Sequence, residues 1–509
     1  MLVKVLSCAI YGLEGMLVEV EIDSVRHLPG FSIVGLPDPA VKESRDRVKL
    51  AIINSGFRYP PGYFTANLAP ADIKKEGPIY DLPIALGVLA SSDQISIKRK
   101  DFLVFGELSL DGEVRPVNGV LPMCLVAKQK KIKNVIVPKD NISEAGLVSG
   151  IDAYPVENLS QAVEIVEGNG SMKPHKVALK KVFEGEQDPD IDFSDVKGQA
   201  HAKRALEIAA AGGHNILMIG PPGSGKTMLA KRLPTIMPPL SLDEALEITR
   251  LYSISGLLNS KDFLVSKRPF RAPHHTTSDI GIIGGGRNPR PGEISLSHRG
   301  ILFLDEFPEY DRDVLEALRQ PLEDGTILIS RALSSVSYPA EFMLVAAMNP
   351  CPCGSYGDRE KRCRCHPFRI ERYWNRISGP LFDRIDIQLE IPRLKKEELL
   401  RHPAGETSKE IKGRVVKARE IQWKRFKDTV VLSNSRMTSR QIKQFCVLDD
   451  EAVEIMKSAI VHYRLSGRSY DRVLKVARTI ADLEISDDIK AGHVAEAVQY
   501  RCIDKDSYN

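Results

Sequence analysis

Apolar and charged residues alternate near the start of the chain in the pattern of a half-buried β-strand. Within "GMLVEVEIDSV", which begins at Gly15, apolar side chains occupy every second position and acidic ones lie between them from Glu19 to Asp23. Successive side chains of a strand point to opposite faces, so this segment predicts a strand with one buried face. The alternation argues against a secretory signal peptide. No apolar run approaches the roughly 18 residues of a membrane span, so we expect no membrane partner.

Changes in this pattern divide the chain into an N-terminal domain, a linker, a central domain and a C-terminal helical region. Short strands and helices follow one another over residues 1–168, and a polar stretch without sustained periodicity, which we interpret as a linker, covers 169–192. Buried strands alternate with helices over 193–394, which predicts an α/β domain with a parallel sheet. Residues 395–509 begin with a predicted linking helix and continue into helix-like segments divided by polar turns. We expect these segments to form a helical lid.

The central domain contains a glycine-rich loop between a predicted strand and a predicted helix. "NILMIG" is a short apolar run typical of a buried strand, and "GPPGSGKT" follows its last residue. In this context the G-x-x-x-x-G-K-T pattern predicts backbone N–H groups around a phosphate and a lysine that reaches the outer phosphates of ATP. The predicted nucleotide-binding residues are Gly220, Pro221, Pro222, Gly223, Ser224, Gly225, Lys226, Thr227, Met228 and Asp305.

Further apolar strands end or begin at residues suited to ATP hydrolysis. "GILFLDE" ends in Asp305, which we expect to hold Mg²⁺ together with Thr227, and in Glu306, which we expect to polarise the attacking water. "FMLVAAMN" ends in Asn349, whose amide could orient that water or the outer phosphate. Arg384 precedes the alternating strand pattern of "DRIDIQLEI". An acidic strand end is a weak signal alone, but after a phosphate loop it indicates a hydrolytic site.

Composition and charge fit a chain of several globular domains without selecting its substrate. The 509 residues are 43% hydrophobic and 27% charged, with a formal net charge of +4. At the usual ~150 residues per domain this length predicts about three domains. So small a net charge gives no overall preference for nucleic acid. Eight cysteines without the spacing of a small secreted domain favour a reducing compartment, so we expect a cytoplasmic location.

The motifs "GPPGSGKT", "ILFLDE", "AAMNPCPCG" and "GPLFDRID" resemble, in order and spacing, those of the magnesium-chelatase-like AAA+ ATPases. Within that clade the chain resembles the ComM/YifB group of bacterial competence-related proteins over essentially its whole length. The long stretch "RPFRAPHHTTSDIGIIGGGRNPRPGEISLSHRG" is part of that similarity. The resemblance implies that Lys226, Thr227, Asp305, Glu306 and Asn349 have the roles given above.

The resemblance also implies residues that act between subunits. Arg384 matches the arginine finger, which would reach the ATP of a neighbouring subunit and stabilise the charge of the transition state. A surface ion pair is the alternative. A finger acting in trans requires a homo-oligomeric ring, which we expect to be a hexamer. Arg472 resembles the second sensor residue of the helical lid, although Arg468 and Arg478 lie close enough in the sequence to be confused with it.

The N-terminal domain resembles the proteolytic domain of Lon but lacks its catalytic pair. "KKEGPIYDLPIALGVLAS" and "GELSLDGEVRPVNGVLPMCLVAKQKKIKNVIVP" carry the similarity. Lon needs a Ser-Lys pair, in which a base activates a nucleophile, and the matching positions hold Ile79 and Leu121. We therefore expect an inactive Lon-like α/β domain that serves as a scaffold, a ring-assembly surface or a partner-binding module.

The stretch "CPCGSYGDREKRCRC" contains two closely spaced pairs of cysteines. Nine residues separate the pair Cys351 and Cys353 from the pair Cys363 and Cys365, so four thiolates could close on one tetrahedral zinc ion. The C-x-C spacing is tighter than the C-x-x-C spacing common in zinc ribbons, and His366 is a spare ligand. Reduced cysteines that merely pack in the fold are the alternative.

Two basic segments are candidates for contact with DNA. "GIIGGGRNPRPGE" carries Arg287 and Arg290, and a predicted hairpin, "TILISRALSSVSYPA", carries Arg331. Repeated around a ring, these arginines would present a positively charged channel to phosphates. The family resemblance implies a DNA motor that drives branch migration during recombination of incoming DNA in natural transformation. A magnesium-chelatase motor subunit, whose family ordinarily lacks the Lon-like domain, and a protein-remodelling ATPase remain alternatives.

Overall fold

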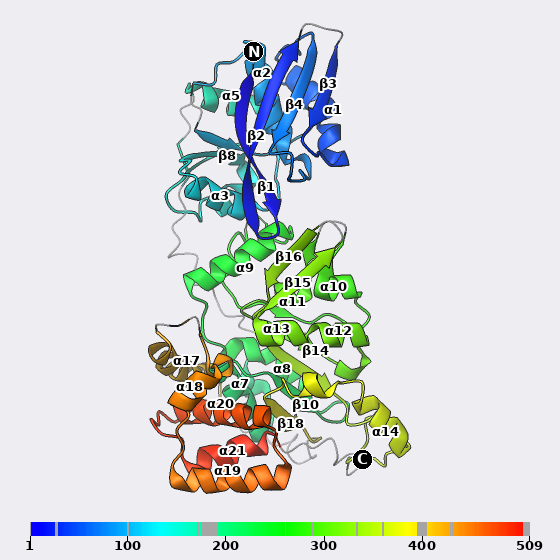
Figure 1. Ribbon diagram of the computed structural model, residues 1–509, viewed down its shortest axis with the longest axis vertical. Helices are drawn as coiled ribbons and strands as arrows, with labels where there is room; N and C mark the ends of the chain where they lie inside the picture. The colour runs from blue at the N-terminus through cyan, green and yellow to red at the C-terminus, as the bar shows by residue number, and fades with distance from the viewer. Residues whose placement is uncertain are drawn as a thin grey trace. The chain divides into compact units, whose positions relative to one another are not determined.

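The computed structural model groups the chain into two compact units (Figure 1). One unit comprises residues 1–184 with 242–266, and the other comprises 185–241 with 267–509. The structure describes residues 2–25, 29–98, 101–169, 173–175, 191–259, 261–286, 289–331, 334–358, 361–393, 405–427, 429 and 431–501. Arg287 and most of the predicted linker therefore lie outside the described residues.

A mixed β-sheet forms the centre of the first unit. In spatial order its described strands are β3 (Gly30–Val34), β4 (Tyr63–Ala69), β2 (Glu14–Val25), β1 (Val3–Tyr11), β5 (Phe102–Val104), β8 (Asn134–Pro138) and β9 (Asp152–Val156). The predicted half-buried strand is confirmed as β2, which pairs antiparallel with β1 and β4. Its apolar Val18, Val20 and Ile22 are fully buried, whereas Asp23 is exposed. The alternating sequence thus places one face of β2 in the core.

Helices pack against this sheet through strongly apolar faces. The described helices of the N-terminal part are α1 (Pro39–Asn54), α2 (Asp81–Ser91), α3 (Val120–Gln129), α4 (Ile142–Ala145) and α5 (Leu159–Glu167). Every residue of α2 is buried, which agrees with its nearly continuous apolar sequence. The buried carboxylate of Asp81 accepts two hydrogen bonds from Arg47 of α1, at 2.8 and 3.2 Å. This bidentate ion pair joins α1 to α2.

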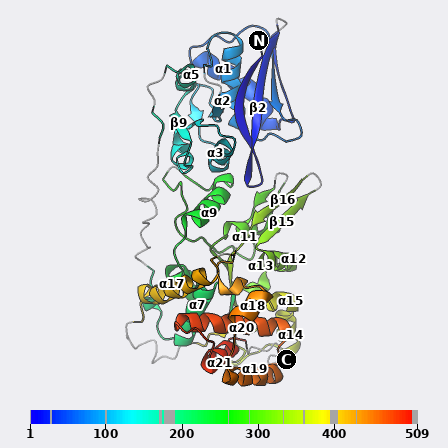
Figure 2. The same ribbon diagram turned by 60° about the vertical axis from the view of Figure 1, so that its left-hand side comes forward.

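Residues 242–266 pack with the first unit, although the predicted boundaries place them in the ATPase core. The segment forms helix α9 (Leu242–Ile254), which buries Ala245, Ile248 and Leu251 and lies against α3. Figure 2 shows α9 and α3 next to each other in a second view. The apolar stripe of α9 indicates that one face is buried, but the pattern does not identify the surface that covers it.

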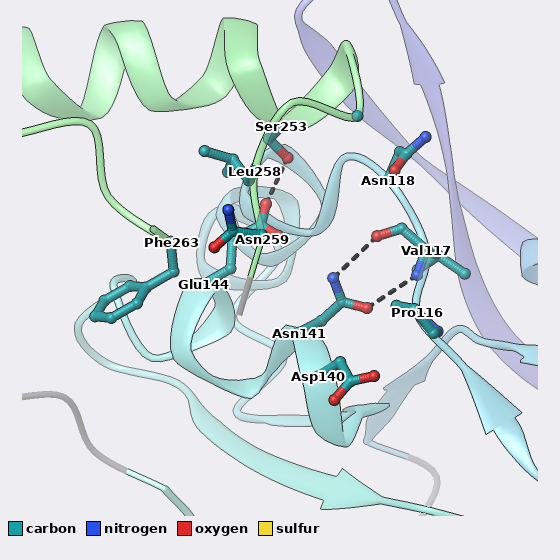
Figure 3. Close-up of a pocket in the computed structure, with 11 residues that line it drawn as sticks. Pro116, Val117, Asn118, Asp140, Asn141, Glu144, Ser253, Leu258, Asn259 and Phe263 are labelled. Carbon is teal, nitrogen blue, oxygen red and sulfur yellow. Dashed lines mark hydrogen bonds between the residues drawn. The ribbon is translucent and has the colours of Figure 1, made fainter. Parts of the chain in front are cut away.

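A buried carboxylate connects α9 to α3 beside a pocket of about 360 Å³ (Figure 3). The hydroxyl of Ser253, in α9, donates a hydrogen bond to Glu144, which also accepts one from the backbone N–H of Leu121 at 2.7 Å. The carbonyl of Ser253 accepts a hydrogen bond from the N–H of Gly119 at 3.1 Å. Burial raises the pKa of Glu144, and the hydrogen bonds from Ser253 and Leu121 act in the opposite direction. Glu144 therefore depends on donors from two separate parts of the chain.

We expect Ser253→Ala to loosen α9, because it removes a donor from the buried Glu144 carboxylate at a cost of about 1–3 kcal/mol. Hydrogen–deuterium exchange of the backbone over residues 242–266 would measure this, and faster exchange is expected in the variant. Ser255→Ala is the matched control, since the Ser255 hydroxyl donates a local hydrogen bond to the carbonyl of Leu251 at 2.7 Å. Equal protection of the segment in both variants would contradict the expectation.

A parallel β-sheet forms the centre of the second unit, as the sequence predicts. In spatial order its described strands are β11 (Phe270–Arg271), β14 (Ile301–Leu304), β17 (Met343–Met348), β10 (Ile216–Ile219) and β18 (Ile387–Glu390). Each neighbouring pair is parallel. Every residue of β10, β14 and β17 is buried, because helices cover both faces of a parallel sheet in α/β domains. Helices α7 (Ala200–Gly212) and α8 (Lys226–Ile236) flank β10 in the sequence.

The C-terminal region is helical and shares one hydrophobic core with this sheet. Its described helices are α17 (Ser408–Arg425), α18 (Ser439–Phe445), α19 (Asp450–Tyr463), α20 (Gly467–Leu483) and α21 (Ala491–Gln499) (Figure 1). Ile411, Val415 and Ala418 of α17 are buried. The predicted α/β N-terminal domain, parallel central sheet and C-terminal helical region are therefore confirmed. Among the described helices, none combines the length and apolar character needed to cross a bilayer.

Candidate nucleotide site

The predicted phosphate loop connects β10 to α8. Gly223 and Gly225 have φ values of +79° and +89°, in the left-handed region that favours glycine. A side chain at Gly220 would bring a Cβ atom within 2.2 Å of the carbonyl oxygen of Ile391. The Lys226 ammonium donates to the carbonyl oxygens of Gly220 and Pro221 at 2.7 and 2.9 Å. The loop thus holds its lysine against its own backbone, directly before the N-terminus of α8, where N–H groups favour an anion.

The first acidic residue after β14 lies beside the first turn of α8. The Thr227 hydroxyl donates a hydrogen bond to Asp305 at 2.7 Å, and the same carboxylate accepts the backbone N–H of Glu306 at 2.9 Å. A hydroxyl and a carboxylate oxygen in contact are ligands that Mg²⁺ prefers. The structure therefore brings together the two side chains that the sequence assigns to the metal.

A histidine that the sequence reading assigned no role contacts Glu306. The Nδ1 atom of His275 lies 3.0 Å from a Glu306 carboxylate oxygen, and Glu306 itself has a left-handed backbone with φ +52°. The ring of Tyr310 meets that of His275 edge-on, with centroids 6.4 Å apart. His275 is part of "RAPHHTTSD", a stretch within the segment that resembles the ComM/YifB group. Its position after β11, next to the strand that ends at the acidic pair, is the signal that could have identified it.

Asn349 directly follows β17, which lies between β10 and β14. Parallel strands end at the same edge of a sheet, so Asn349 is at the edge that carries the phosphate loop and Asp305. Helix α14 (Pro367–Trp374) holds the backbone next to it. The indole N–H of Trp374 donates a hydrogen bond to the carbonyl of Pro350 at 3.0 Å.

Arg384 lies at the opposite edge of the sheet. Its carbonyl accepts a hydrogen bond from the side chain of Asn215 at 3.1 Å, and Asn215 precedes β10, whereas the phosphate loop follows that strand. The Arg384 guanidinium pairs with Glu323 and donates to the carbonyl of Pro380 at 2.7 Å. The structure therefore does not bring Arg384 to the phosphate loop of its own chain.

Arg472 of α20 lies beside Arg384. It donates to the carbonyl of Arg384 at 3.2 Å and pairs with the carboxylate of Asp386. The other two candidates for the second sensor residue differ in environment: Arg468 is exposed, and Arg478 is buried and paired with Asp482. Among the described contacts of these three arginines, those of Arg472 reach the segment that carries Arg384.

A buried carboxylate underlies this arginine pair. Asp386 is 3% exposed and accepts the backbone N–H of Asn215 at 3.1 Å, and His214 Nδ1 lies 3.5 Å from it. Burial opposes ionisation of Asp386, but the charge of Arg472 and the contact with His214 outweigh it and hold the pKa of that carboxyl well below its ordinary value. Asp386 thus connects the start of β10, β18 and the lid helix α20.

The four cysteines of the predicted metal site come together after β17. Their sulfur atoms all lie within 4.8 Å of one another, and those of Cys351, Cys353 and Cys363 are separated by 3.4 to 3.7 Å. Four sulfurs at about 2.3 Å from a tetrahedral zinc would be about 3.8 Å apart. The cluster, completed by Cys365, therefore suggests zinc. His366 instead caps α14, accepting the N–H of Phe368 at 3.3 Å.

The two predicted DNA-contacting segments lie side by side. The first includes the paired strands β12 (Gly284–Gly285) and β13 (Arg290–Pro291), and the second is the confirmed hairpin of β15 (Thr326–Arg331) and β16 (Ser334–Pro339). The Tyr338 hydroxyl connects them by donating to the carbonyl of Pro289 at 2.7 Å. Arg290 is exposed, while Arg287 and the side chain of Arg331 lie outside what the structure describes. Tyr338 packs in the fold, with 1% exposure.

The Lon-like positions are occupied by buried aliphatic side chains. Ile79 lies in the 3₁₀ turn η1 (Pro78–Tyr80) before α2 and is 9% exposed, and Leu121 lies in the first turn of α3 and is 1% exposed. Neither side chain has an atom that can attack a carbonyl or accept a proton. The hydrogen bond of the Leu121 backbone to Glu144 is the polar contact at this position.

The fold and site define a magnesium-chelatase-type AAA+ domain, a class that implies ATP hydrolysis. Residues 192–399 match the family "Magnesium chelatase, subunit ChlI", and 405–501 match its C-terminal family, "Magnesium chelatase, subunit ChlI C-terminal". Residues 18–141 match "Subunit ChlI of Mg-chelatase". Together these segments span the Lon-like domain, the sheet domain and the helical region.

Full-length relatives narrow the class to one family. The chain is 44% identical over 505 residues to "Competence protein ComM" of Haemophilus influenzae, which covers 98% of this chain and 97% of the relative. It is 44% identical over 501 residues to "Uncharacterized protein YifB" of Salmonella typhimurium, which covers 98% and 96%. The chain belongs to the ComM/YifB family. Its N-terminal domain is also 35% identical over 102 residues to "Archaeal Lon protease" of Thermococcus kodakarensis, covering 19% of this chain and 16% of the relative.

We expect Asp386→Asn to destabilise the second unit by about 3–5 kcal/mol at neutral pH, because it leaves Arg472 without its buried partner. The folded-state pKa of Asp386 is depressed, so its contribution is present above the ordinary aspartate pKa of about 3.9 and is lost as the pH falls below it. Calorimetric unfolding of wild type and variant at pH 7 and near pH 2.5 would measure the difference, which should shrink at the lower pH because that pH lies below the unfolded-state pKa.

The exposed Asp383 provides the control for this measurement. Its carboxylate lies 3.9 Å from Arg501 and is 41% exposed, so Asp383→Asn should change stability by no more than about 0.5 kcal/mol. A difference between wild type and Asp386→Asn that stays constant over the pH range would contradict a charged, paired Asp386.

Proposed function

We propose that this chain is a ring-forming ATPase that couples ATP hydrolysis to DNA translocation and branch migration during recombination of incoming DNA. One observation carries the proposal. The residues suited to hydrolysis lie at one edge of the sheet and Arg384 lies at the other, in a chain that matches "Competence protein ComM" over 98% of its length. The substrate is the part of the proposal that rests on the relative and on the two basic segments.

In this proposal a water molecule attacks the γ-phosphorus of ATP. Glu306 accepts a proton from the water as the new P–O bond forms, and the bond between the γ-phosphorus and the bridging oxygen breaks to release ADP. Lys226 and the N–H groups of the phosphate loop stabilise the phosphate charge. Mg²⁺, held by Thr227 and Asp305, would neutralise charge on the phosphate oxygens. Asn349 orients the water from the end of the neighbouring strand.

Arg384 acts on the site of a neighbouring subunit in this proposal. A strand of four residues, at about 3.3 Å per residue, separates the two sheet edges by roughly 13 Å, whereas a hydrogen bond to phosphate requires about 3 Å. A second copy of the chain brings its Arg384 to the phosphates. Arg472 moves with it, because the Arg472 guanidinium donates a hydrogen bond to the carbonyl of Arg384. Repetition of this contact closes a ring, which we propose to be a hexamer.

The proposed DNA contacts are the arginines of the two adjoining segments. Arg290 is exposed on β13, and β15 and β16 are joined to that segment through Tyr338. With Arg287 and Arg331, these segments would present six copies of a basic surface to the DNA backbone of a substrate. Contacts of this kind track phosphates without reading sequence, which suits a motor that must move along any incoming strand.

Two other classes of substrate follow from the same ATPase domain. A magnesium-chelatase motor subunit remains an alternative. Because residues 18–141 match a chelatase family, the presence of the N-terminal domain does not distinguish a chelatase subunit from a DNA motor. The full-length similarity to ComM favours DNA. A protein-remodelling ring is the other alternative, and the glycine-rich, basic composition of the segment around Arg290 disfavours it.

We also propose a structural zinc ion at Cys351, Cys353, Cys363 and Cys365, whose sulfur spacing fits tetrahedral coordination. The ion would cross-link the loop that carries these residues and take no part in the chemistry of ATP. Zinc thiolates of this kind persist in reducing compartments, and a DNA substrate is also consistent with a cytoplasmic location.

The Lon-like domain, with Ile79 and Leu121 at the dyad positions, serves as a scaffold or partner-binding module without protease activity.

We expect ATP turnover to rise in the presence of DNA and to rise most with a four-way junction. Steady-state turnover of purified protein would be measured alone and with single-stranded, duplex and junction DNA. Glu306→Gln should abolish turnover under all four conditions, because the amide accepts no proton from water. Glu309→Gln, a nearby exposed change, should leave it within about twofold. If none of the three DNAs changes ATP turnover, in protein shown to form rings, DNA is not the substrate and a protein or chelatase partner is favoured.

Mixed rings test whether Arg384 serves a neighbouring subunit. Arg384→Ala and Lys226→Ala should each lower ATP turnover, the former by about 10³-fold or more. When the two variants are mixed, some subunit boundaries combine an intact Lys226 with an intact Arg384, and turnover should recover in part. No recovery in rings shown to contain both variants would mean that Arg384 acts within its own chain or has only a structural role.

A further inference from the structure

The loop that carries the four cysteines lies against the phosphate loop. Gly354, next to Cys353, has a backbone φ of +76°, and a Cβ atom at this position would lie 2.5 Å from Cδ of Pro222. The same atom would be 3.8 Å from Cγ of Asn349. The residue directly after the first cysteine pair therefore lies against both the phosphate loop and the candidate sensor.

The second cysteine pair leads into the helix that holds the other side of the sensor. Cys365 is separated only by His366 from the start of α14. Trp374, the last residue of that helix, donates a hydrogen bond to the carbonyl of Pro350, the residue directly after Asn349. Asn349 thus lies between two segments of the cysteine loop, one that carries the first cysteine pair and one that leads from the second pair into α14.

A metal ion bound by both cysteine pairs would cross-link these two segments and close the loop between them. Without the cross-link, the polar segment between Cys353 and Cys363 must be held by other contacts, and ordering such a loop costs conformational entropy. Metal binding supplies that free energy, because the ligands are brought together as the ion binds. Outer-shell contacts of a metal site in turn transmit its geometry to the neighbouring residues.

We propose that the metal-loaded four-cysteine cluster is a positioning device for the nucleotide site, setting Asn349 and the phosphate loop so that ATP binding and turnover depend on metal loading. The ligand class is a thiolate-preferring divalent ion such as zinc. Gly354 is the point of contact through which the cluster acts on Pro222, and α14 is the element through which it acts on Asn349. This inference rests on the proposed ATPase function, but nucleotide binding tests it separately from turnover.

The cluster itself is tested by Cys353→Ser and by Cys365→His in the full-length protein. The serine variant removes a thiolate, whereas histidine at position 365 keeps a zinc ligand. Each protein is measured for zinc per chain by elemental analysis, for affinity towards a fluorescent ATP analogue and for ATP turnover. A Trp423→Phe background leaves Trp374 as the remaining tryptophan of the two in the chain, so its emission reports the indole that contacts Pro350.

We expect Cys353→Ser to lose zinc, to shift the Trp374 emission, and to bind the ATP analogue and turn over ATP roughly 10- to 100-fold less well. Cys365→His should retain zinc and recover most of the emission and nucleotide affinity. Far-ultraviolet circular dichroism should be unchanged in both. A zinc-free variant with wild-type emission, affinity and turnover would overturn the proposal, as would wild-type protein purified without bound metal.

Two glycines of the loop separate the contact with Pro222 from the metal. Gly354 and Gly357 have similar φ values, +76° and +72°, but a Cβ at Gly357 would meet nothing within 4 Å. Gly354→Ala should keep zinc and lose about tenfold or more in nucleotide affinity, whereas Gly357→Ala should keep both. Equal affinities in the two variants would overturn the proposed contact.

The failure of the proposed function has a different signature. If the wild type binds zinc and the ATP analogue but does not hydrolyse ATP, the ATPase proposal falls. In that case a coupled loss of zinc, Trp374 emission shift and nucleotide affinity in Cys353→Ser still supports the positioning role, and independence of these three quantities still excludes it.

Discussion

The parallel direction of β10, β14 and β17 is the constraint on which the candidate site depends. Parallel strands send their following residues to one edge of the sheet, so segments at 220–227, 305–306 and 349 meet although long stretches of sequence separate them. The same direction puts Arg384 before β18 and therefore at the far edge. One topological rule thus both brings the candidate hydrolytic residues together and separates Arg384 from them within one chain.

Each edge of this sheet is fixed by a local polar or sulfur cluster. At the amino edge, Asp386 gathers Arg472 and His214, so the lid helix α20 and the strand β18 share a buried charge. At the carboxyl edge, the cysteine cluster lies next to Asn349 and the phosphate loop. A buried ion pair such as that of Asp386 with Arg472 favours one arrangement, because a shift of either group leaves a buried charge unpaired.

The sequence alone predicts the parts of the structure that local patterns determine. Alternation identified β2, and the strand, glycine loop and acidic strand end were recognisable because their chemistry is confined to a few adjacent residues. The pattern could not assign α9 to the first unit, since an amphipathic helix does not name the surface that covers it. Likewise, no local motif predicts the position of His275. Its contact with Glu306, at 3.0 Å, follows from the fold, which brings two separate segments together.

The first unit is not a continuous piece of chain. Its N-terminal part and α9 are joined through the second unit, since residues 185–241 belong there. A chain cut at Glu184 would therefore lack Ser253 and leave the Glu144 carboxylate short of a donor. During synthesis, this unit cannot be completed until the phosphate loop has already been made. In evolutionary terms, a Lon-like domain with this arrangement cannot be exchanged as a single cassette, because part of its core is encoded within the ATPase.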